Sequence, residues 1–303
     1  MRALVIGEGM VEFTRQGEGG SWAQGIGGDT LNTAVHLARL GANVAYASAV
    51  GQDIFSDTLR AAIAEEGIET ALLARDPARQ CGIYFIATDE AGERSFTYWR
   101  SQSAARRLVE AIGTARLAEA AAAVELVHLS LITLAVIPEV HRQTLLELVT
   151  RAKSAGTKVS FDSNYRPALW ESPETAAHWS GAFAAIADFG LPTFEDEVAL
   201  GTGASATQIS AAWQARGCGE VVVKLGAEGC LLPDGRICAA ERVNAVDTSG
   251  AGDSFDAAYL HGRMSDRSPE QAAQQANRLA GWVVGRKGAL PADDADAYRQ
   301  THP

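Results

Sequence analysis

The sequence lacks the patterns that usually indicate a metal centre, a redox motif or a membrane span. Its four cysteines form no C-x-x-C pair, and its six histidines show no H-E-x-x-H spacing. We therefore expect reduced, partly buried thiols. No run approaches the roughly 18 consecutive apolar residues that a membrane helix needs, and the N-terminus enters an apolar strand without an export signal. These absences predict a cytoplasmic protein without a membrane partner.

Positive charge is also scarce. The chain carries 26 Lys and Arg against 37 Asp and Glu, a formal net charge of −11, and no basic cluster alternates with aromatic residues. Neither a nucleic acid nor an anionic membrane is therefore expected as a partner, and a small anion needs a local basic site. With 303 residues, of which 47% are hydrophobic, the chain can nevertheless bury a large core.

Two common glycine-rich nucleotide loops are missing or incomplete. No G-x-x-x-x-G-K-[ST] sequence occurs, which excludes a P-loop, and Gly7-Glu8-Gly9 lacks the third glycine of the dinucleotide fingerprint. A different segment, residues 221–230, runs from an apolar strand into a turn that contains Gly226 and Gly229. Such a loop can wrap around a nucleotide.

Short β-branched runs alternate with longer helical patterns. The predicted strands cover residues 3–6, 44–50, 124–130, 158–162 and 220–225, and the predicted helices cover residues 31–40, 140–155 and 173–187. Apolar strands separated by helices indicate an α/β fold with a mainly parallel sheet covered on both faces, and ligands at the carboxyl ends of the strands. No repeat or Pro-rich linker divides the chain, so we expect a single domain over residues 1–303.

One segment departs from this alternation. Residues 81–88 and 94–100 flank a turn at residues 89–93, which predicts a β-hairpin. Together with the glycine-rich stretch 13–26, the hairpin can form a small sheet that acts as a lid over the strand ends, built from about residues 10–26 and 80–101. An ordinary edge hairpin is the alternative.

The segment VDTSGAGDSF, residues 246–255, combines a turn of small residues with a carboxylate and the start of a helix. Gly250 and Gly252 let backbone amides approach an anion, and a helix that begins near Gly252 offers unpaired N–H groups at its positive end. A carboxylate facing a phosphate is repulsive, so Asp253 is best explained as a base that takes a proton from an attacking hydroxyl. The pattern predicts phosphoryl transfer to an alcohol; a simple helix entry is the alternative.

Residues 27–34 place two glycines and a group of polar side chains at the mouth of a helix. Close backbone approach and several hydrogen bonds become available there, which suits a polyhydroxylated ligand such as a sugar. A helix cap by Asp29 or Thr30 accounts for the same residues, and both roles are compatible.

Two arginines lie at predicted strand ends. Arg166 follows the strand that ends at Asp162, and Arg100 ends the predicted hairpin. The guanidinium fork can bind a carboxylate or a phosphate in bidentate fashion, so an acidic protein with arginines at these places is expected to bind an anionic substrate. Pairing of each arginine with an acidic side chain is the alternative.

With these motifs in this order, the chain resembles the ribokinase-like (PfkB) carbohydrate kinases, and within that family the 2-keto-3-deoxygluconate kinases. The family motifs are residues 27–34 and 247–253, and the marks of the subgroup are residues 28–33, 92–100 and 164–170. The resemblance implies a three-layer α/β/α sandwich with a mainly parallel central sheet and a small β-sheet lid. It also implies ATP with Mg²⁺ as phosphoryl donor, and a K⁺ site near Asp247 and Ser249.

The resemblance also implies roles for individual residues. Asp253 is the expected catalytic base, and the backbone of Gly250, Ala251 and Gly252 is the expected anion hole. Substrate contacts are expected from Gly28, Asp29, Asn32, Tyr84, Tyr98, Arg100, Arg166 and Asp253. Nucleotide contacts are expected from Asn164, Arg166, Lys224, Gly226, Gly229, Gly250, Gly252 and Asn277. Glu195 is the expected contact to magnesium, through water, although Pro192 replaces the asparagine that usually accompanies this glutamate.

The expected reaction is ATP-dependent phosphorylation of the C6 hydroxyl of 2-dehydro-3-deoxy-D-gluconate. A kinase for a neutral sugar, of the fructokinase or ribokinase type, is the alternative within the same class, and a non-catalytic sugar or nucleotide sensor is the alternative from another class. The intact GAGD turn and the lack of an appended module favour the enzyme. The expected partners are the sugar acid, ATP and, if exposed lid sheets pair, further copies of the chain in a homodimer or a higher homo-oligomer. The preferred epimer, gluconate or galactonate, stays open.

Overall fold

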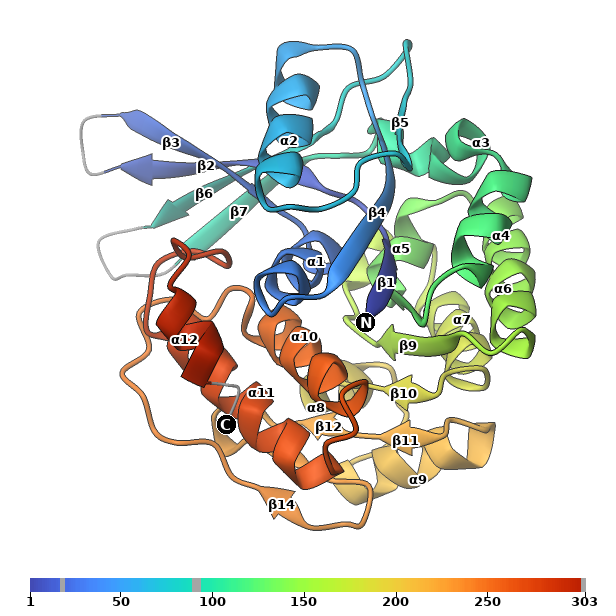
Figure 1. Cartoon of the computed structure of the whole chain (residues 1–303), viewed down its shortest axis with the longest axis vertical. Helices are drawn as coiled ribbons and strands as arrows, with labels where there is room; N and C mark the ends of the chain where they lie inside the picture. Colours follow the sequence, from blue (N-terminus) through green and yellow to red (C-terminus); the bar gives the residue numbers. More distant parts are fainter. Residues whose placement is uncertain (17–19, 89–93, 301–303) are drawn as a thin grey trace.

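A parallel sheet of seven strands forms the centre of the computed structural model, which describes residues 1–16, 20–88 and 94–300 (Figure 1). The strand order is β11-β10-β9-β8-β1-β4-β5. These strands are β1 (Arg2–Ile6), β4 (Asn43–Val50), β5 (Leu73–Arg75), β8 (Leu126–Ser130), β9 (Lys158–Asp162), β10 (Phe189–Gly190) and β11 (Glu220–Val221). Because every strand pair in this sheet is parallel, the carboxyl ends of the strands share one edge.

Helices cover both faces of this sheet. In β1, Ala3 and Val5 point into one hydrophobic core, whereas Leu4 and Ile6 point into the other, as the two-residue period of a strand requires. The first core is closed by α1 (Asp29–Arg39), α2 (Ile54–Glu65), α10 (Ala251–Arg263) and α11 (Pro269–Val284). The second is closed by α3 (Leu108–Ile112), α4 (Thr114–Ala122), α5 (Leu131–Val136), α6 (Glu139–Ser154), α7 (Pro173–Ala184) and α9 (Ala206–Arg216). The expected three-layer sandwich is confirmed.

A second sheet projects from this body (Figure 1). Its order is β3-β2-β6-β7, with β2 (Met10–Gln16), β3 (Ser21–Gly27), β6 (Gly82–Thr88) and β7 (Arg94–Trp99). The predicted hairpin is confirmed, because β6 and β7 pair antiparallel with Ile83 opposite Trp99; its turn at 89–93 lies outside the described residues. The stretch 13–26 joins this sheet as part of β2 and β3, and β2 pairs with β6 in parallel. The hairpin is therefore not an edge of the central sheet.

The predicted strand 220–225 is divided between two sheets. Glu220 and Val221 pair with β10 in the central sheet, whereas β12 (Val223–Lys224) belongs to a small antiparallel sheet with β13 (Cys230–Leu231) and β14 (Ile237–Cys238). A continuous apolar run does not show where its hydrogen-bonding partner changes, so the sequence could not locate this break. Two short helices, α8 (Phe194–Ala199) and α12 (Ala295–Gln300), complete the list.

The structure also bears on the cysteines and on the expected lack of a membrane-spanning helix. All four cysteines are free, as predicted, and all four are buried, which is more than the partial burial expected. Within the described ranges, no helix is both long enough and apolar enough to cross a membrane.

Candidate active site

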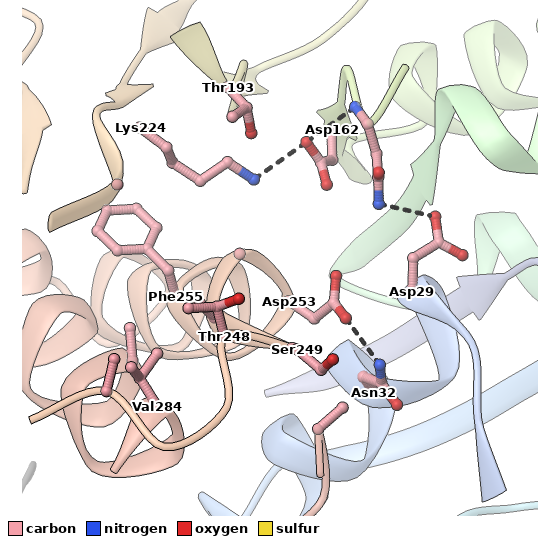
Figure 2. A pocket seen from close by; sticks show the side chains of 18 of the residues that line it. Asp29, Asn32, Asp162, Thr193, Lys224, Thr248, Ser249, Asp253, Phe255 and Val284 are labelled. Atoms are coloured by element: carbon pink, nitrogen blue, oxygen red, sulfur yellow. Dashed lines mark hydrogen bonds and ion pairs between the residues drawn. The ribbon is translucent and has the colours of Figure 1, made fainter. Parts of the chain in front are cut away.

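A cavity of about 1300 Å³ lies where the carboxyl ends of the central strands meet the projecting sheet and the start of α10. Figure 2 shows side chains from several of these elements converging on it. Almost all predicted site residues line this one cavity. They are Gly28, Asp29, Asn32, Tyr84, Tyr98, Arg100, Asn164, Arg166, Lys224, Gly226, Gly229, Gly250, Ala251, Gly252, Asp253 and Asn277.

The turn before α10 opens into the cavity. Gly250 is the N-cap of this helix in the left-handed conformation, with φ of 72°, and a Cβ at this position would lie 2.7 Å from the Cβ of Ala289. Both its backbone angle and the lack of space therefore require glycine. The Ala251 amide lies 3.4 Å from the Thr248 carbonyl oxygen. The first turn of α10 thus presents the remaining N–H groups of Gly252 and Asp253, and the positive helix end, to an anion.

Asp253 lies in this first turn and faces the cavity. Asn32 of α1 donates a hydrogen bond of 2.7 Å from its Nδ2 to Oδ2 of Asp253 (Figure 2). Burial and, after it, the nearby Asp29 carboxylate raise the pKa of Asp253 to about 7, against the opposing effect of the Asn32 hydrogen bond. Among the described residues, no ion pair involves Asp253. Its carboxylate is therefore held by a neutral amide and can accept a proton near neutral pH.

Asp29 is a second buried carboxylate in the cavity. It accepts hydrogen bonds from the Ser130 hydroxyl and, at 3.4 Å, from Nδ2 of Asn164. Burial raises its pKa, and the Ser130 hydrogen bond opposes this. The N-cap of α1 is Gly28, without a side-chain cap hydrogen bond, so the capping alternative for Asp29 and Thr30 is wrong. Ser130 was missed at the sequence level, although a polar residue at the end of an apolar strand is a usable signal.

The projecting sheet contributes tyrosines and Arg100 to the cavity. Tyr84 and Tyr98 stack with ring centroids 5.7 Å apart, and the Tyr84 hydroxyl donates to the Glu12 carboxylate. Arg100 is ion-paired with the fully buried Glu8, with Nε of Arg100 2.7 Å from Oε2 of Glu8. Sequence reasoning missed both glutamates, because nothing in the local sequence shows that Glu8 meets Arg100 or that Glu12 meets Tyr84.

Arg166 lines the other side of the cavity and also carries an acidic partner. Its Nη1 lies 3.2 Å from Oδ1 of Asp196, and its side chain is 53% exposed. Each arginine thus faces the cavity and pairs with a carboxylate, as the alternative interpretation expected, and binding of an anionic substrate stays a prediction. About half of the Arg166 side chain remains accessible to a ligand.

The expected magnesium contact Glu195 is not brought to the site. Glu195 is exposed and does not line the cavity, whereas the next residue, Asp196, does. Both lie in the first turn of α8, where successive side chains point about 100° apart. The structure thus places Asp196, and not Glu195, at the cavity, because a step of one residue along a helix changes the face to which the side chain points.

Lys224 reaches the turn before α10 from β12. Its Nζ lies 3.0 Å from Oδ1 of Asp162 and 2.9 Å from Oδ1 of Asp256, and a Cβ at Gly252 would lie 3.6 Å from Nζ. Figure 2 shows Lys224 and Asp162 above the Asp253 carboxylate. Asn277 is anchored farther along the cavity, since its Nδ2 donates to the Cys238 carbonyl at 3.0 Å.

Comparison with known proteins agrees with this geometry. The family model described as pfkB family carbohydrate kinase matches residues 2–295. The chain is 37% identical over 295 residues to a 2-dehydro-3-deoxygluconokinase of Haemophilus influenzae, covering 94% of each chain. It is also 37% identical over 300 residues to a 2-dehydro-3-deoxygluconokinase of Escherichia coli K12, covering 95% of this chain and 96% of the relative.

Among solved structures, a fructokinase double mutant from Vibrio cholerae O395 with bound fructose, ADP and potassium ion superposes with a TM-score of 0.85. It is 26% identical, and the match covers 98% of this chain and 97% of the fructokinase. Family model, relatives and fold thus agree over nearly the whole length. The chain belongs to the pfkB family of carbohydrate kinases.

Proposed function

We propose that this carbohydrate kinase transfers the γ-phosphoryl group of ATP to the C6 hydroxyl of 2-dehydro-3-deoxy-D-gluconate, giving the 6-phosphate and ADP. The observation that carries the reaction type is the buried Asp253 carboxylate beside the anion-binding turn of α10, held by Asn32 rather than by a cation. The names of the relatives from Haemophilus influenzae and Escherichia coli support the substrate.

Asp253 acts as the general base in this proposal. Asn32 occupies Oδ2 and leaves Oδ1 directed toward the cavity (Figure 2), where it can take the proton of the attacking hydroxyl. The amides of Gly250, Ala251 and Gly252 form the proposed anion hole, and of these the Ala251 amide also lies 3.4 Å from the Thr248 carbonyl oxygen. They stabilise the negative charge that builds up on the transferring group.

The lining of the cavity fits ATP with magnesium. The N-terminal turn of α10 and the Lys224 ammonium supply donors and positive charge for phosphates, and Asn277 lies farther along the same cavity. In the described part of the chain, no group of three or more His, Cys, Asp or Glu side chains is placed to hold a metal ion. A magnesium ion that is coordinated mainly by nucleotide oxygens and water would fit this lining. Asp196, rather than Glu195, would orient the ion. The bound ion would neutralise phosphate charge.

A monovalent cation is proposed near the segment 247–249. The Vibrio cholerae fructokinase structure holds a potassium ion. In this chain, Asp247 ties that segment to the C-terminal loop, because its Oδ1 accepts from the Ser249 amide at 2.9 Å and its Oδ2 from the Gly288 amide at 2.7 Å. A cation bound there would support the turn that forms the anion hole.

Arg100 and Arg166 are the proposed contacts to the substrate carboxylate. They face the cavity from the projecting sheet and from the loop after β9, and Arg166 is half exposed. A coupled ADP-release assay over keto-deoxy sugar acids, neutral hexoses and pentoses tests the substrate class. We expect the sugar acid to have the highest kcat/KM, and Arg166→Ala to reduce this preference. Efficient turnover of fructose or ribose, with Arg166→Ala leaving the preference unchanged, would contradict the proposal.

The projecting sheet is proposed to be a lid that closes over the sugar and excludes water, which suppresses hydrolysis of ATP. Met10, Tyr84 and Tyr98 line the cavity from it. Alternate residues point to the other face of the sheet, where Trp22 is 42% exposed and Trp99 is 61% exposed. We propose that this aromatic face pairs with a second copy in a homodimer.

A further inference from the structure

Lys224 is a cation with very little contact to solvent, held between two carboxylates. Its side chain is 7% exposed, that of Asp162 is 5% exposed, and that of Asp256 is fully buried. Asp162 and Lys224 line the cavity, whereas Asp256 does not. Asp256 therefore contacts the ammonium from behind, on the side away from the ligand.

The position of Asp256 follows from that of the catalytic aspartate. Asp256 lies three residues after Asp253 on α10, so the two side chains share one face of the helix. This spacing lets one helix present a carboxylate to the substrate and another to the cation beside it. Both oxygens of Asp256 lie within 3.0 Å of the Lys224 Nζ.

We propose that Asp256 is a positioning residue for the kinase reaction, which together with Asp162 fixes the charged Lys224 ammonium beside the α10 turn for contact with the nucleotide phosphates. The inference rests on the proposed function in one respect, the binding of a nucleotide polyphosphate at this turn. It does not depend on the identity of the sugar.

The charges around Lys224 set the direction of the expected effect. Burial lowers the pKa of Lys224, but Asp162 and Asp256 more than offset this and raise it above its usual value. The other titratable groups that act on or beside it are Asp253 of α10, Asp196 of α8 and His128 of β8. Burial lowers the pKa of His128 to about 4, so His128 is neutral in the alkaline range. Lys224 is thus the group in this cluster that can lose its charge there.

The test is the affinity for MgADP as a function of pH, measured by titration calorimetry between pH 8 and 11. In Asp256→Asn, the pKa of Lys224 falls, because burial, which lowers it, is then opposed mainly by Asp162. The ammonium is then lost as the pH rises. We expect MgADP affinity in this variant to fall about tenfold per pH unit above the lowered pKa, while the wild-type affinity stays nearly constant.

Glu220→Gln is a matched control. Oε1 of Glu220, in β11, lies 2.8 Å from Nε of Arg263, the last residue of α10. Like Asp256→Asn, this variant therefore removes the carboxylate of an ion pair between α10 and a nearby strand. We expect its pH profile to match that of the wild type. A flat profile for Asp256→Asn, or the same change in both variants, would overturn the proposal.

Two further variants keep the inference testable. Lys224→Arg in the Asp256→Asn background supplies a cation that stays charged at alkaline pH, so the pH dependence should disappear. If Asp256→Asn does not fold, Asp162→Asn replaces it, with the same expected pH profile. If neither variant folds, the ion pairs of Lys224 with Asp162 and Asp256 serve the stability of the fold, and the proposal is overturned. If the wild type binds MgADP but does not phosphorylate the sugar acid, the proposed substrate fails and this inference stands.

Discussion

Asn32 and Asp253 are separated by 221 residues in the sequence, yet Nδ2 of Asn32 lies 2.7 Å from Oδ2 of Asp253. The contact joins the first turn of α1 to the first turn of α10. A second hydrogen bond strengthens the junction, since the Thr33 hydroxyl donates to the Asp253 carbonyl at 3.3 Å. The two sequence motifs, at residues 27–34 and 247–253, thus form one continuous site.

Asp253→Asn should lose most turnover and keep ligand binding. The amide cannot take the hydroxyl proton, and a positioned base typically contributes about 10²–10⁴-fold in rate. We expect kcat to fall in this range while the calorimetric affinity for MgADP changes little. A variant with near-normal kcat would show that Asp253 is not the base.

The reaction rate should depend on pH through Asp253. Because its pKa is raised to about 7, the carboxyl is protonated and inactive in acid, and the rate rises as the pH increases through 7. Asn32→Ala removes a hydrogen bond that lowers this pKa, so the acidic limb of the kcat profile should move to higher pH. A limb that stays in place, or moves toward acid, would contradict this assignment.

The adjacent pair Glu195 and Asp196 allows a direct comparison of magnesium dependence. Asp196 lines the cavity and Glu195 does not, so Asp196→Asn should raise the Mg²⁺ concentration needed for half-maximal rate. Because Asp196 also pairs with Arg166, the KM of the sugar substrate is measured alongside. Glu195→Gln is the matched control, and an equal effect of both variants would argue against a role for Asp196 in orienting the metal.

The aromatic outer face of the projecting sheet should determine the oligomeric state. Trp99→Lys places a charge on this face, where it would be buried in the proposed homodimer without a partner. Light scattering after gel filtration should give a dimer for the wild type and a monomer for this variant. A wild-type monomer would contradict the proposed interface.

Local features of the sequence were enough to predict the main elements and the central motif. The strand at 158–162 was predicted with the bounds that the structure has, and the helix beginning near Gly252 begins at Ala251. The motif predicted a turn of small residues, and Gly250 has the left-handed backbone angle that glycine readily adopts in such a turn. Such features depend on neighbouring residues, and the period of apolar residues records which face is buried.

Pairing between distant residues was decided only by the tertiary structure. Nothing near Arg100 indicates Glu8, and nothing near Lys224 indicates Asp256. The shift of the candidate magnesium contact from Glu195 to Asp196 has the same origin, because the rotation of α8 about its axis is set by packing. The sequence by itself determined which backbone segments could bind a phosphate and a sugar. The fold decided which charges surround them, since electrostatic partners are selected by distance in space and by burial, neither of which is recorded in the order of residues.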